Sequence, residues 1–215
     1  MAIKAAKAPL LYVIGDRGAF KHDSDWLKAM TTVAESLIEH ENVALQVRVK
    51  GSCSTSRFRR MQLARMRLDE FIEDGLRVFL NGTVTQADRL NFKGVHLTQA
   101  LLDETMHNPN HLEIATSTHS IESIQKSAEI GASFCVFGPV YNPKSKDAPA
   151  VGLGALKLTA QQSPIDIVAL GGITHERVSP CIKAGAQGVA CISAVMRSSQ
   201  PGKSINQLIQ AAQLR

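Results

Sequence analysis

Short strand-like runs recur along this chain and alternate with segments whose apolar residues repeat at helical spacing. Eight runs are rich in apolar and β-branched residues, at positions 10–14, 43–50, 76–80, 94–97, 111–116, 134–138, 166–170 and 188–192. Amphipathic helical patterns fill most of the intervals, at 25–39, 56–73, 121–130, 176–184 and 205–214. Gly75, Gly131 and Gly185 stand where helices are expected to end. This alternation predicts a parallel sheet covered by helices.

Eight strand and helix units with no Ser/Gly/Pro-rich linker predict one closed α/β barrel, a single (β/α)8 TIM barrel domain over residues 1–215. An open doubly wound sheet is the alternative. Against it, no Gly-x-Gly-x-x-Gly follows the first strand, where Gly15 and Gly18 flank Asp16 and Arg17 instead. The barrel predicts where chemistry lies, because active sites of this fold form where strands end and the next loops begin.

The apolar runs are too short for a membrane span, which requires about 20 residues. The run at 10–14 is followed by Gly15, Asp16 and Arg17, so it lacks the small-residue cleavage site of a signal peptide. We therefore expect a cytoplasmic protein with no membrane partner. Four scattered cysteines have no metal-ligand spacing and are expected to be free, mostly buried thiols: Cys53, Cys135, Cys181 and Cys191.

The chain is basic, with a formal net charge of +5 and a pI near 9.1. Its densest basic stretch, 57–67, has helical spacing and only Phe58 as an interleaved aromatic residue, which favours a solvated helix face. We expect no nucleic-acid partner. Mild basicity suits an enzyme with phosphorylated substrates.

The second strand reads LQVRVK and places Gln46, Arg48 and Lys50 on one face. In a closed barrel that face points to the mouth, where a guanidinium fork and a movable ammonium group suit an anion larger than one carboxylate. At a wet sheet edge the same side chains would simply be solvated.

The seventh and eighth strands end in ALGGIT and CISAV. Paired glycines let backbone N–H groups approach a ligand, and the loops after strands seven and eight form the usual phosphate site of this barrel. Gly171, Gly172, Ile192 and Ser193 are therefore candidate phosphate-binding residues. A tight turn that needs glycine is the alternative for the Gly-Gly pair.

The fifth strand ends in ATSTHS and places Ser117 and His119 at the mouth. His119 is the candidate catalytic residue, because imidazole exchanges protons near neutral pH. His96 lies inside the short strand GVHL and is expected to be a hydrogen-bonded core residue. After the sixth strand, the stretch 138–156 is predicted to be a long loop in which Ser145 and Lys146 reach an anion, or touch only water.

Eight motifs occur in an order that resembles the thiamine phosphate synthase and TenI-like superfamily: LYVIGDR, LQVRVK, LNGTV, GVHLTQ, STHS, GPVYNPKSK, ALGGI and GVACISAV. The resemblance covers nearly the whole chain. It implies a barrel of thiamine biosynthesis that binds a thiazole phosphate at the last two loops and, in the synthases, a pyrimidine diphosphate near Gln-x-Arg-x-Lys. The ligand residues it implies are Gln46, Arg48, Lys50, Asn81, Ser117, Ser145, Lys146, Gly171, Gly172, Ile192 and Ser193.

The sequence departs from the synthase pattern at the metal site. Synthases of this superfamily have Asn-Asp after the third strand and Gly-Gln-Glu-Asp after the fourth, and the two aspartates hold magnesium. Here the first pair is Asn81-Gly82 and the second motif is Thr98-Gln99-Ala100-Leu101. Asp103 could substitute only after a loop shift. We expect no metal or other cofactor, with magnesium needed only if the protein is a synthase.

Three functions follow from the resemblance. The preferred one is a TenI-like thiazole tautomerase in which His119 is the general acid/base, since that reaction needs a phosphate site and a proton carrier but no metal. The alternative is a thiamine phosphate synthase, and the second alternative is a non-catalytic regulator that binds thiamine-pathway phosphates. The expected partners are a small-molecule thiazole phosphate or thiamine phosphate. The sequence leaves the oligomeric state open, a homo-oligomer included.

Overall fold

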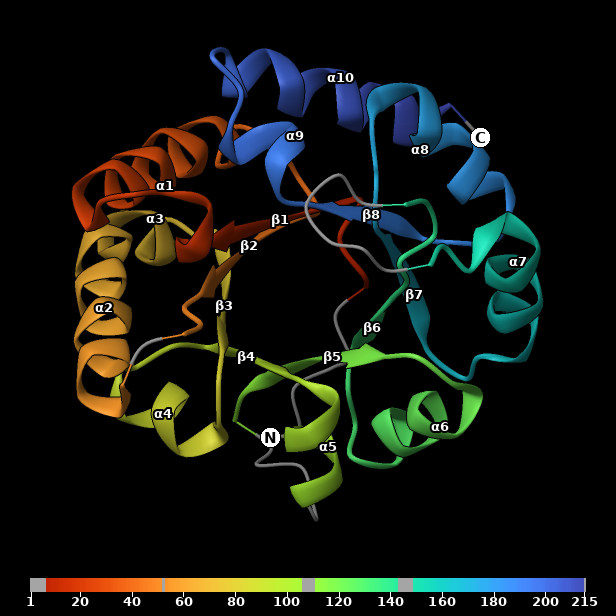
Figure 1. The fold of residues 1–215 in the computed structure, drawn as a ribbon, viewed down its shortest axis with the longest axis horizontal. Helices are drawn as coiled ribbons and strands as arrows, with labels where there is room; N and C mark the ends of the chain where they lie inside the picture. Colours follow the sequence, from red (N-terminus) through yellow and green to blue (C-terminus); the bar gives the residue numbers. More distant parts are fainter. Residues whose placement is uncertain (1–6, 52, 106–110, 143–148, 215) are drawn as a thin grey trace.

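The computed structural model describes residues 7–51, 53–105, 111–142 and 149–214. Eight parallel strands close into a barrel in chain order, so the predicted (β/α)8 TIM barrel is confirmed (Figure 1). The strands are β1 (Leu11–Asp16), β2 (Val43–Arg48), β3 (Arg77–Asn81), β4 (Gly94–Leu97), β5 (Glu113–Thr118), β6 (Phe134–Phe137), β7 (Asp166–Leu170) and β8 (Gly188–Cys191).

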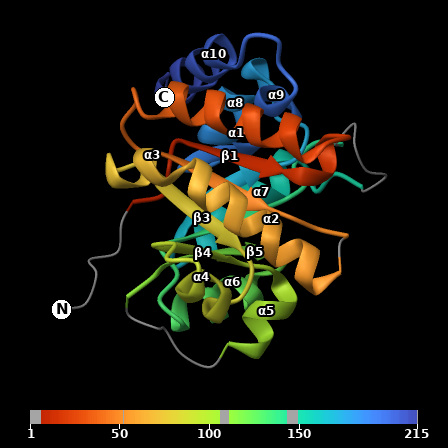
Figure 2. The same ribbon diagram turned by 90° about the vertical axis from the view of Figure 1, so that its left-hand side faces the viewer.

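Helices surround the barrel on all sides (Figure 1). They are a 3-10 turn, η1 (Arg17–Ala19), and α1 (Asp23–Leu37), α2 (Ser54–Arg67), α3 (Asp69–Glu73), α4 (Val84–Arg89), α5 (Gln99–Glu104), α6 (Ile121–Glu129), α7 (Gly152–Gln162), α8 (His175–Lys183), α9 (Ser193–Met196) and α10 (Pro201–Gln213). The C-terminal helix α10 packs against both α1 and α8, and Figure 2 shows it lying along α1. The last helix therefore closes the ring next to the first.

The helices predicted from clear apolar spacing are confirmed, whereas the helices without such spacing were not predicted. The predicted helix 56–73 is divided at Leu68 into α2 and α3. Four short or glycine-containing helices had no recognised pattern: α4, α5, α7 and α9. The prediction of a loop over 138–156 is wrong at its end, because α7 begins at Gly152 and buries Leu156. Two glycines in its first turn hid the apolar spacing.

The predicted helix ends are confirmed at three glycines. Gly75, Gly131 and Gly185 follow α3, α6 and α8, with φ angles of 100°, 75° and 102°. Residues with a Cβ rarely adopt this left-handed backbone, whereas glycine adopts it freely. These residues therefore end the helices and turn the chain toward the next strand.

Three aromatic rings fill the middle of the barrel. Tyr12, Phe79 and Phe134 meet edge to face, with ring centroids 5.3 to 5.5 Å apart. Gly94 of β4 faces the same layer, where a Cβ would lie 2.8 Å from the Phe79 ring. The interior is thus a packed core at this level, and a ligand is confined to the mouth above it.

Lys7 and Ala8 lie at the opposite end of the barrel, where the strands begin. The N–H of Ala8 donates to the Asp166 carboxylate over 3.1 Å, and the carbonyl of Lys7 accepts from Arg77. Arg77 also forms a two-point ion pair with Glu113 of β5. These contacts tie three strand beginnings together and form a polar floor.

The helices that the structure describes include none long and apolar enough to cross a membrane. The four cysteines are free thiols, of which Cys53 is exposed and the other three are buried. The prediction for the cysteines is therefore confirmed.

Candidate functional site

Gln46 and Arg48 point into the barrel, as the alternation of β2 predicts. They share a face with Ala44, which packs among the interior residues, whereas Leu45 and Val47 pack outward against the helices. The Gln46 amide is 1% exposed, and its Nε2 donates to the Tyr12 hydroxyl over 3.1 Å. Its Oε1 has no partner among the described residues. A buried acceptor of this kind favours a ligand that supplies a donor.

Asp16 holds Arg48 at the mouth. The two residues are paired in register across β1 and β2, and their side chains form an ion pair. Asp16 also accepts from the N–H of Gly18 over 3.2 Å. Sequence analysis did not select Asp16, although it shares the face of β1 that carries Tyr12 and Ile14. That shared face was the available signal.

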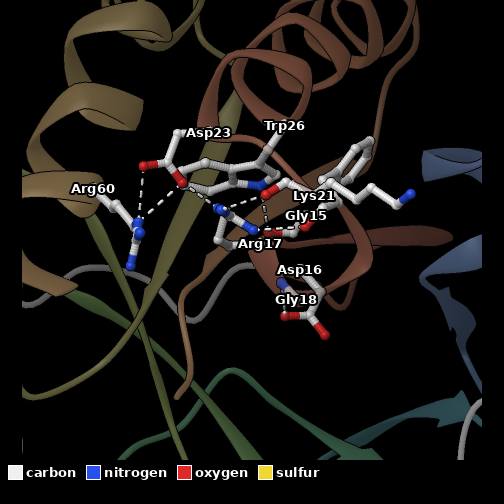
Figure 3. Close-up of polar contacts among 9 residues, drawn as sticks. Gly15, Asp16, Arg17, Gly18, Lys21, Asp23, Trp26 and Arg60 are labelled. Atoms are coloured by element: carbon white, nitrogen blue, oxygen red, sulfur yellow. Dashed lines mark hydrogen bonds and ion pairs between the residues drawn. The ribbon is translucent and has the colours of Figure 1, made fainter. Parts of the chain in front are cut away.

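A cluster of polar contacts holds the loop after β1 in place (Figure 3). Arg17 contacts Asp23, and its Nη1 donates to the carbonyl of Phe20 over 2.7 Å. Arg60 of α2 donates to both oxygens of Asp23 over 2.9 Å, and the Trp26 indole donates to the Gly15 carbonyl. Burial acts to raise the pKa of Asp23, but the two arginines outweigh it and lower the pKa. These contacts hold in place the loop that follows Asp16, the last residue of β1.

His96 and Ser117 extend the polar lining across the interior. The Tyr12 hydroxyl lies 3.2 Å from His96 Nδ1, and His96 Nε2 lies 2.7 Å from Ser117 Oγ. The expectation that His96 is a hydrogen-bonded core residue is confirmed, since it is 1% exposed and bonded at both nitrogens. Burial, together with the nearby charges of Arg48 and Lys50, lowers the pKa of His96 to about 3, so the ring is neutral.

Asn81 and Lys50 are the other candidate ligand residues at the strand ends on this side of the mouth. Asn81 is the last residue of β3, is 9% exposed and lies opposite His96 in register. Lys50 is exposed two residues beyond β2. Because the positive charges of Lys50 and Arg48 both act on the buried ring of His96, this side of the mouth favours an anion.

His119 lies just beyond the end of β5, at the position predicted, and is exposed. Its Nδ1 lies 3.1 Å from the carbonyl oxygen of Gly138. A carbonyl can only accept, so Nδ1 carries a hydrogen, and in the neutral form of the ring Nε2 has a lone pair. This arrangement suits a proton acceptor at the mouth, and the catalytic role of His119 stays a prediction.

The turn after β7 contains the two glycines that were predicted to bind phosphate. Gly171 and Gly172 have φ angles of 107° and 60°, and a Cβ on Gly172 would lie 2.9 Å from Cβ of Tyr141. Arg177 Nη1 donates to the Gly172 carbonyl over 2.8 Å, and its guanidinium stacks on Tyr141 with 4.6 Å from Cζ to the ring centroid. Arg177 therefore fixes the turn, and sequence analysis missed it.

The turn after β8 leaves the barrel beside the turn after β7, because Leu170 and Ala190 are paired across the two strands. Ile192 precedes α9 and Ser193 begins it. Backbone N–H groups of two adjacent turns of this kind can bind one anion between them. Ser145 and Lys146, also predicted to bind ligand, lie outside the described residues.

The residues present do not fit magnesium. The ends of β3 and β4 offer Asn81-Gly82 and Thr98-Gln99 in place of carboxylates. Asp103 contacts Lys126 of α6 over 3.3 Å on the outer surface of the barrel, and Asp16 is paired with Arg48. No group of three metal-binding side chains occurs in ranges 7–51, 53–105, 111–142 and 149–214. Magnesium prefers carboxylate oxygens in protein sites.

Known proteins resemble this chain in both sequence and fold. It is 34% identical to a thiamine-phosphate synthase of Bacillus velezensis over 79% of this chain and 78% of that protein. A thiamine-phosphate synthase of Methanococcus maripaludis is 28% identical over 87% of this chain and 92% of its own length. The solved thiamine phosphate pyrophosphorylase of Pyrococcus furiosus shares the fold, with a TM-score of 0.73, 23% identity and coverage of 94% and 95%.

A family model described as thiamine monophosphate synthase matches residues 11–195, from the first residue of β1 into α9. This range contains every strand of the barrel and all the candidate site residues. The chain therefore belongs to the thiamine monophosphate synthase family.

Proposed function

We propose that this protein is an enzyme of thiamine biosynthesis that couples a pyrimidine diphosphate to a thiazole phosphate, with release of diphosphate. The observation that carries this proposal is that two groups of candidate anion-binding residues lie on opposite sides of one mouth. Arg48 and Lys50 stand at the end of β2, and the Gly171-Gly172 turn follows β7. A single phosphate would occupy one of them, whereas coupling brings two phosphorylated substrates together.

The roles of the residues follow from their chemistry. Arg48 and Lys50 neutralise the diphosphate as it leaves, which favours breaking its bond to the pyrimidine methylene carbon. The turns after β7 and β8 hold the thiazole phosphate, so that the ring nitrogen faces that carbon and forms the new bond. The names of the relatives support this function, since the two proteins compared above are both thiamine-phosphate synthases.

A thiazole tautomerase, the function preferred from sequence alone, is the second candidate. It is favoured by the lack of carboxylates at Gly82 and Leu101, and by the lone pair of His119 Nε2. Such an enzyme would move a proton within the thiazole ring and would need only the phosphate site. A tautomerase substrate would offer no second anionic group for Arg48 and Lys50 to bind, which is why this function ranks second.

The experiment compares both reactions in the same purified protein. One reaction contains pyrimidine diphosphate and thiazole phosphate, with added magnesium or with a chelator, and thiamine phosphate is measured as fluorescent thiochrome. The other contains thiazole carboxylate phosphate, and its isomerisation is followed by NMR. A thiamine-phosphate synthase from a relative with both aspartates is the control for magnesium dependence.

Formation of thiamine phosphate above the protein-free background supports the synthase function, and equal rates with magnesium and with chelator match the missing carboxylates. Isomerisation without coupling would promote the tautomerase. If the protein binds thiamine phosphate but catalyses neither reaction, the non-catalytic regulator becomes the favoured function. If it neither reacts nor binds, all three functions are refuted.

A further inference from the structure

A continuous row of hydrogen bonds crosses the barrel interior from β2 to β5. It joins Gln46, Tyr12, His96 and Ser117, with separations of 3.1, 3.2 and 2.7 Å. The first three residues are at most 1% exposed, while Ser117 is half-buried at the mouth. One end of the row therefore reaches the place where a ligand would bind, and the rest is enclosed by protein.

The order of donors along this row follows from its first member. Gln46 turns its Nε2 toward Tyr12, so the amide donates and the tyrosine oxygen accepts. Burial raises the pKa of Tyr12 well above its usual value, so the hydroxyl keeps its proton. That proton points to His96 Nδ1, the other polar atom within reach. A neutral imidazole that accepts at Nδ1 carries its hydrogen on Nε2.

We propose that Tyr12 and His96 are positioning residues that orient the Ser117 hydroxyl as a hydrogen-bond donor to the ligand. His96 Nε2–H occupies a lone pair of Ser117 Oγ, so the serine hydrogen is directed away from the barrel interior and toward the mouth. A ligand acceptor, such as a ring nitrogen of an aromatic heterocycle, would receive it. The identity of that ligand rests on the proposed function, whereas the order of donors belongs to the free protein.

The opposite order is chemically possible and makes the inference testable. If Gln46 turned its carbonyl toward Tyr12, every bond would reverse, and Ser117 would donate inward and offer only lone pairs to a ligand. The two orders differ in which nitrogen of His96 carries hydrogen. That nitrogen can be identified directly in solution.

The first measurement is long-range ¹H–¹⁵N NMR of the ring nitrogens in the ¹⁵N-labelled free protein. His96 is assigned by its absence in His96→Gln and, if that variant does not fold, as the ring that fails to titrate at mildly acidic pH. We expect a protonated Nε2 and an unprotonated Nδ1. A protonated Nδ1 would overturn the proposal, whatever reaction the protein catalyses.

The second measurement is a double-mutant cycle in the affinity for thiamine phosphate, read by calorimetry. Ser117→Ala should weaken binding about five- to tenfold, the scale of one neutral hydrogen bond. Tyr12→Phe keeps the ring but removes the proton given to His96, and should weaken binding in the same direction. Because both act through one hydroxyl, the double variant should bind about as well as Ser117→Ala alone. Additive losses would refute the coupling.

Ser127→Ala is the matched control. The Ser127 hydroxyl forms a 2.9 Å hydrogen bond with Thr116, which precedes Ser117 in β5. The Thr116 side chain lies on the outer face of β5, outside the barrel interior. Removal of the Ser127 hydroxyl should lower stability without changing affinity or coupling to Ser117. If the wild type does not bind thiamine phosphate, the proposed function fails while the NMR result still decides the order of donors.

Discussion

Asp16 and Arg48 are directly paired across β1 and β2, and their ion pair at the barrel mouth is largely screened from water, with side chains 18% and 16% exposed. The cation predicted to bind an anionic substrate is thus held by a carboxylate before any substrate arrives. Asp16 fixes the place of the guanidinium and offsets part of its charge. Its own place is fixed by the loop that Arg17 and Asp23 brace (Figure 3).

Asp16→Asn should release Arg48 and lower the free energy of unfolding by about 1.5 to 3 kcal/mol, the range for a hydrogen bond to a charged group. Pyrophosphate affinity should change as well, because Arg48 loses both its anchor and its competing anion. The measurements are urea unfolding and calorimetric titration with pyrophosphate. Asp69→Asn, which breaks the exposed pair with Arg65, is the control and should change neither by much. Unchanged unfolding in Asp16→Asn would contradict the role given to the pair.

Gly172→Asp should abolish phosphate binding between the turns after β7 and β8. The new Cβ would lie 2.9 Å from Tyr141 Cβ and 3.0 Å from the carbonyl oxygen of Asn142, and its carboxylate would repel the anion. Calorimetry with thiazole phosphate gives the readout. Gly75→Ala is the control for backbone strain alone, because Gly75 has φ of 100° but open space around it. Retained affinity in Gly172→Asp would place the phosphate elsewhere.

If the protein has tautomerase activity, His119→Ala should lower its rate by about 10² to 10⁴-fold, or roughly 3 to 5 kcal/mol of barrier, with phosphate affinity nearly intact. His119→Asn should be almost as slow, because an amide can bond Gly138 but cannot carry a proton. NMR of thiazole carboxylate phosphate gives the rates. His175→Ala, which changes an exposed histidine on α8, should keep the wild-type rate. Variants as fast as an active wild type would identify another proton carrier.

Stability should fall as the pH is lowered, because of His96. Its pKa is about 3 in the folded protein, against an ordinary value near 6.5, so below about pH 6.5 the unfolded chain binds a proton that the folded protein does not. Stability therefore rises with pH between about 3 and 6.5, by up to about 1.4 kcal/mol per pH unit. Denaturant unfolding of wild type and His96→Gln across this window isolates the effect. Parallel pH profiles would contradict it.

The barrel could be predicted because its strands are short apolar runs and its longer helices have clear spacing. The helix from Gly152 could not, since two glycines weaken both its propensity and its pattern. Packing against the barrel rather than local preference forms that helix. The short helices at α4 and α5 begin with Thr83 and Thr98, whose hydroxyls cap them, a signal present in the sequence but carried by single residues.

Residues of the site were predictable where strand alternation alone decides direction, as for Gln46 and Ser117. Tyr12 was not selected as a site residue, because a tyrosine in an apolar run is expected to lie in the core. It does lie there, and it also takes part in the polar row. Arg177 was hidden for another reason: its contact with Gly172 depends on where α8 begins relative to the turn, and no pattern in the sequence encodes that distance.

The layer of Tyr12, Phe79 and Phe134 separates the two ends of the barrel interior. The polar floor around Arg77 and Glu113 lies on one side of it, and the mouth lies on the other. Directed evolution of this chain can therefore treat them separately. Substitutions that raise thermal tolerance belong at the floor, where they leave substrate preference untouched, and libraries for new substrates belong at the strand ends above the rings.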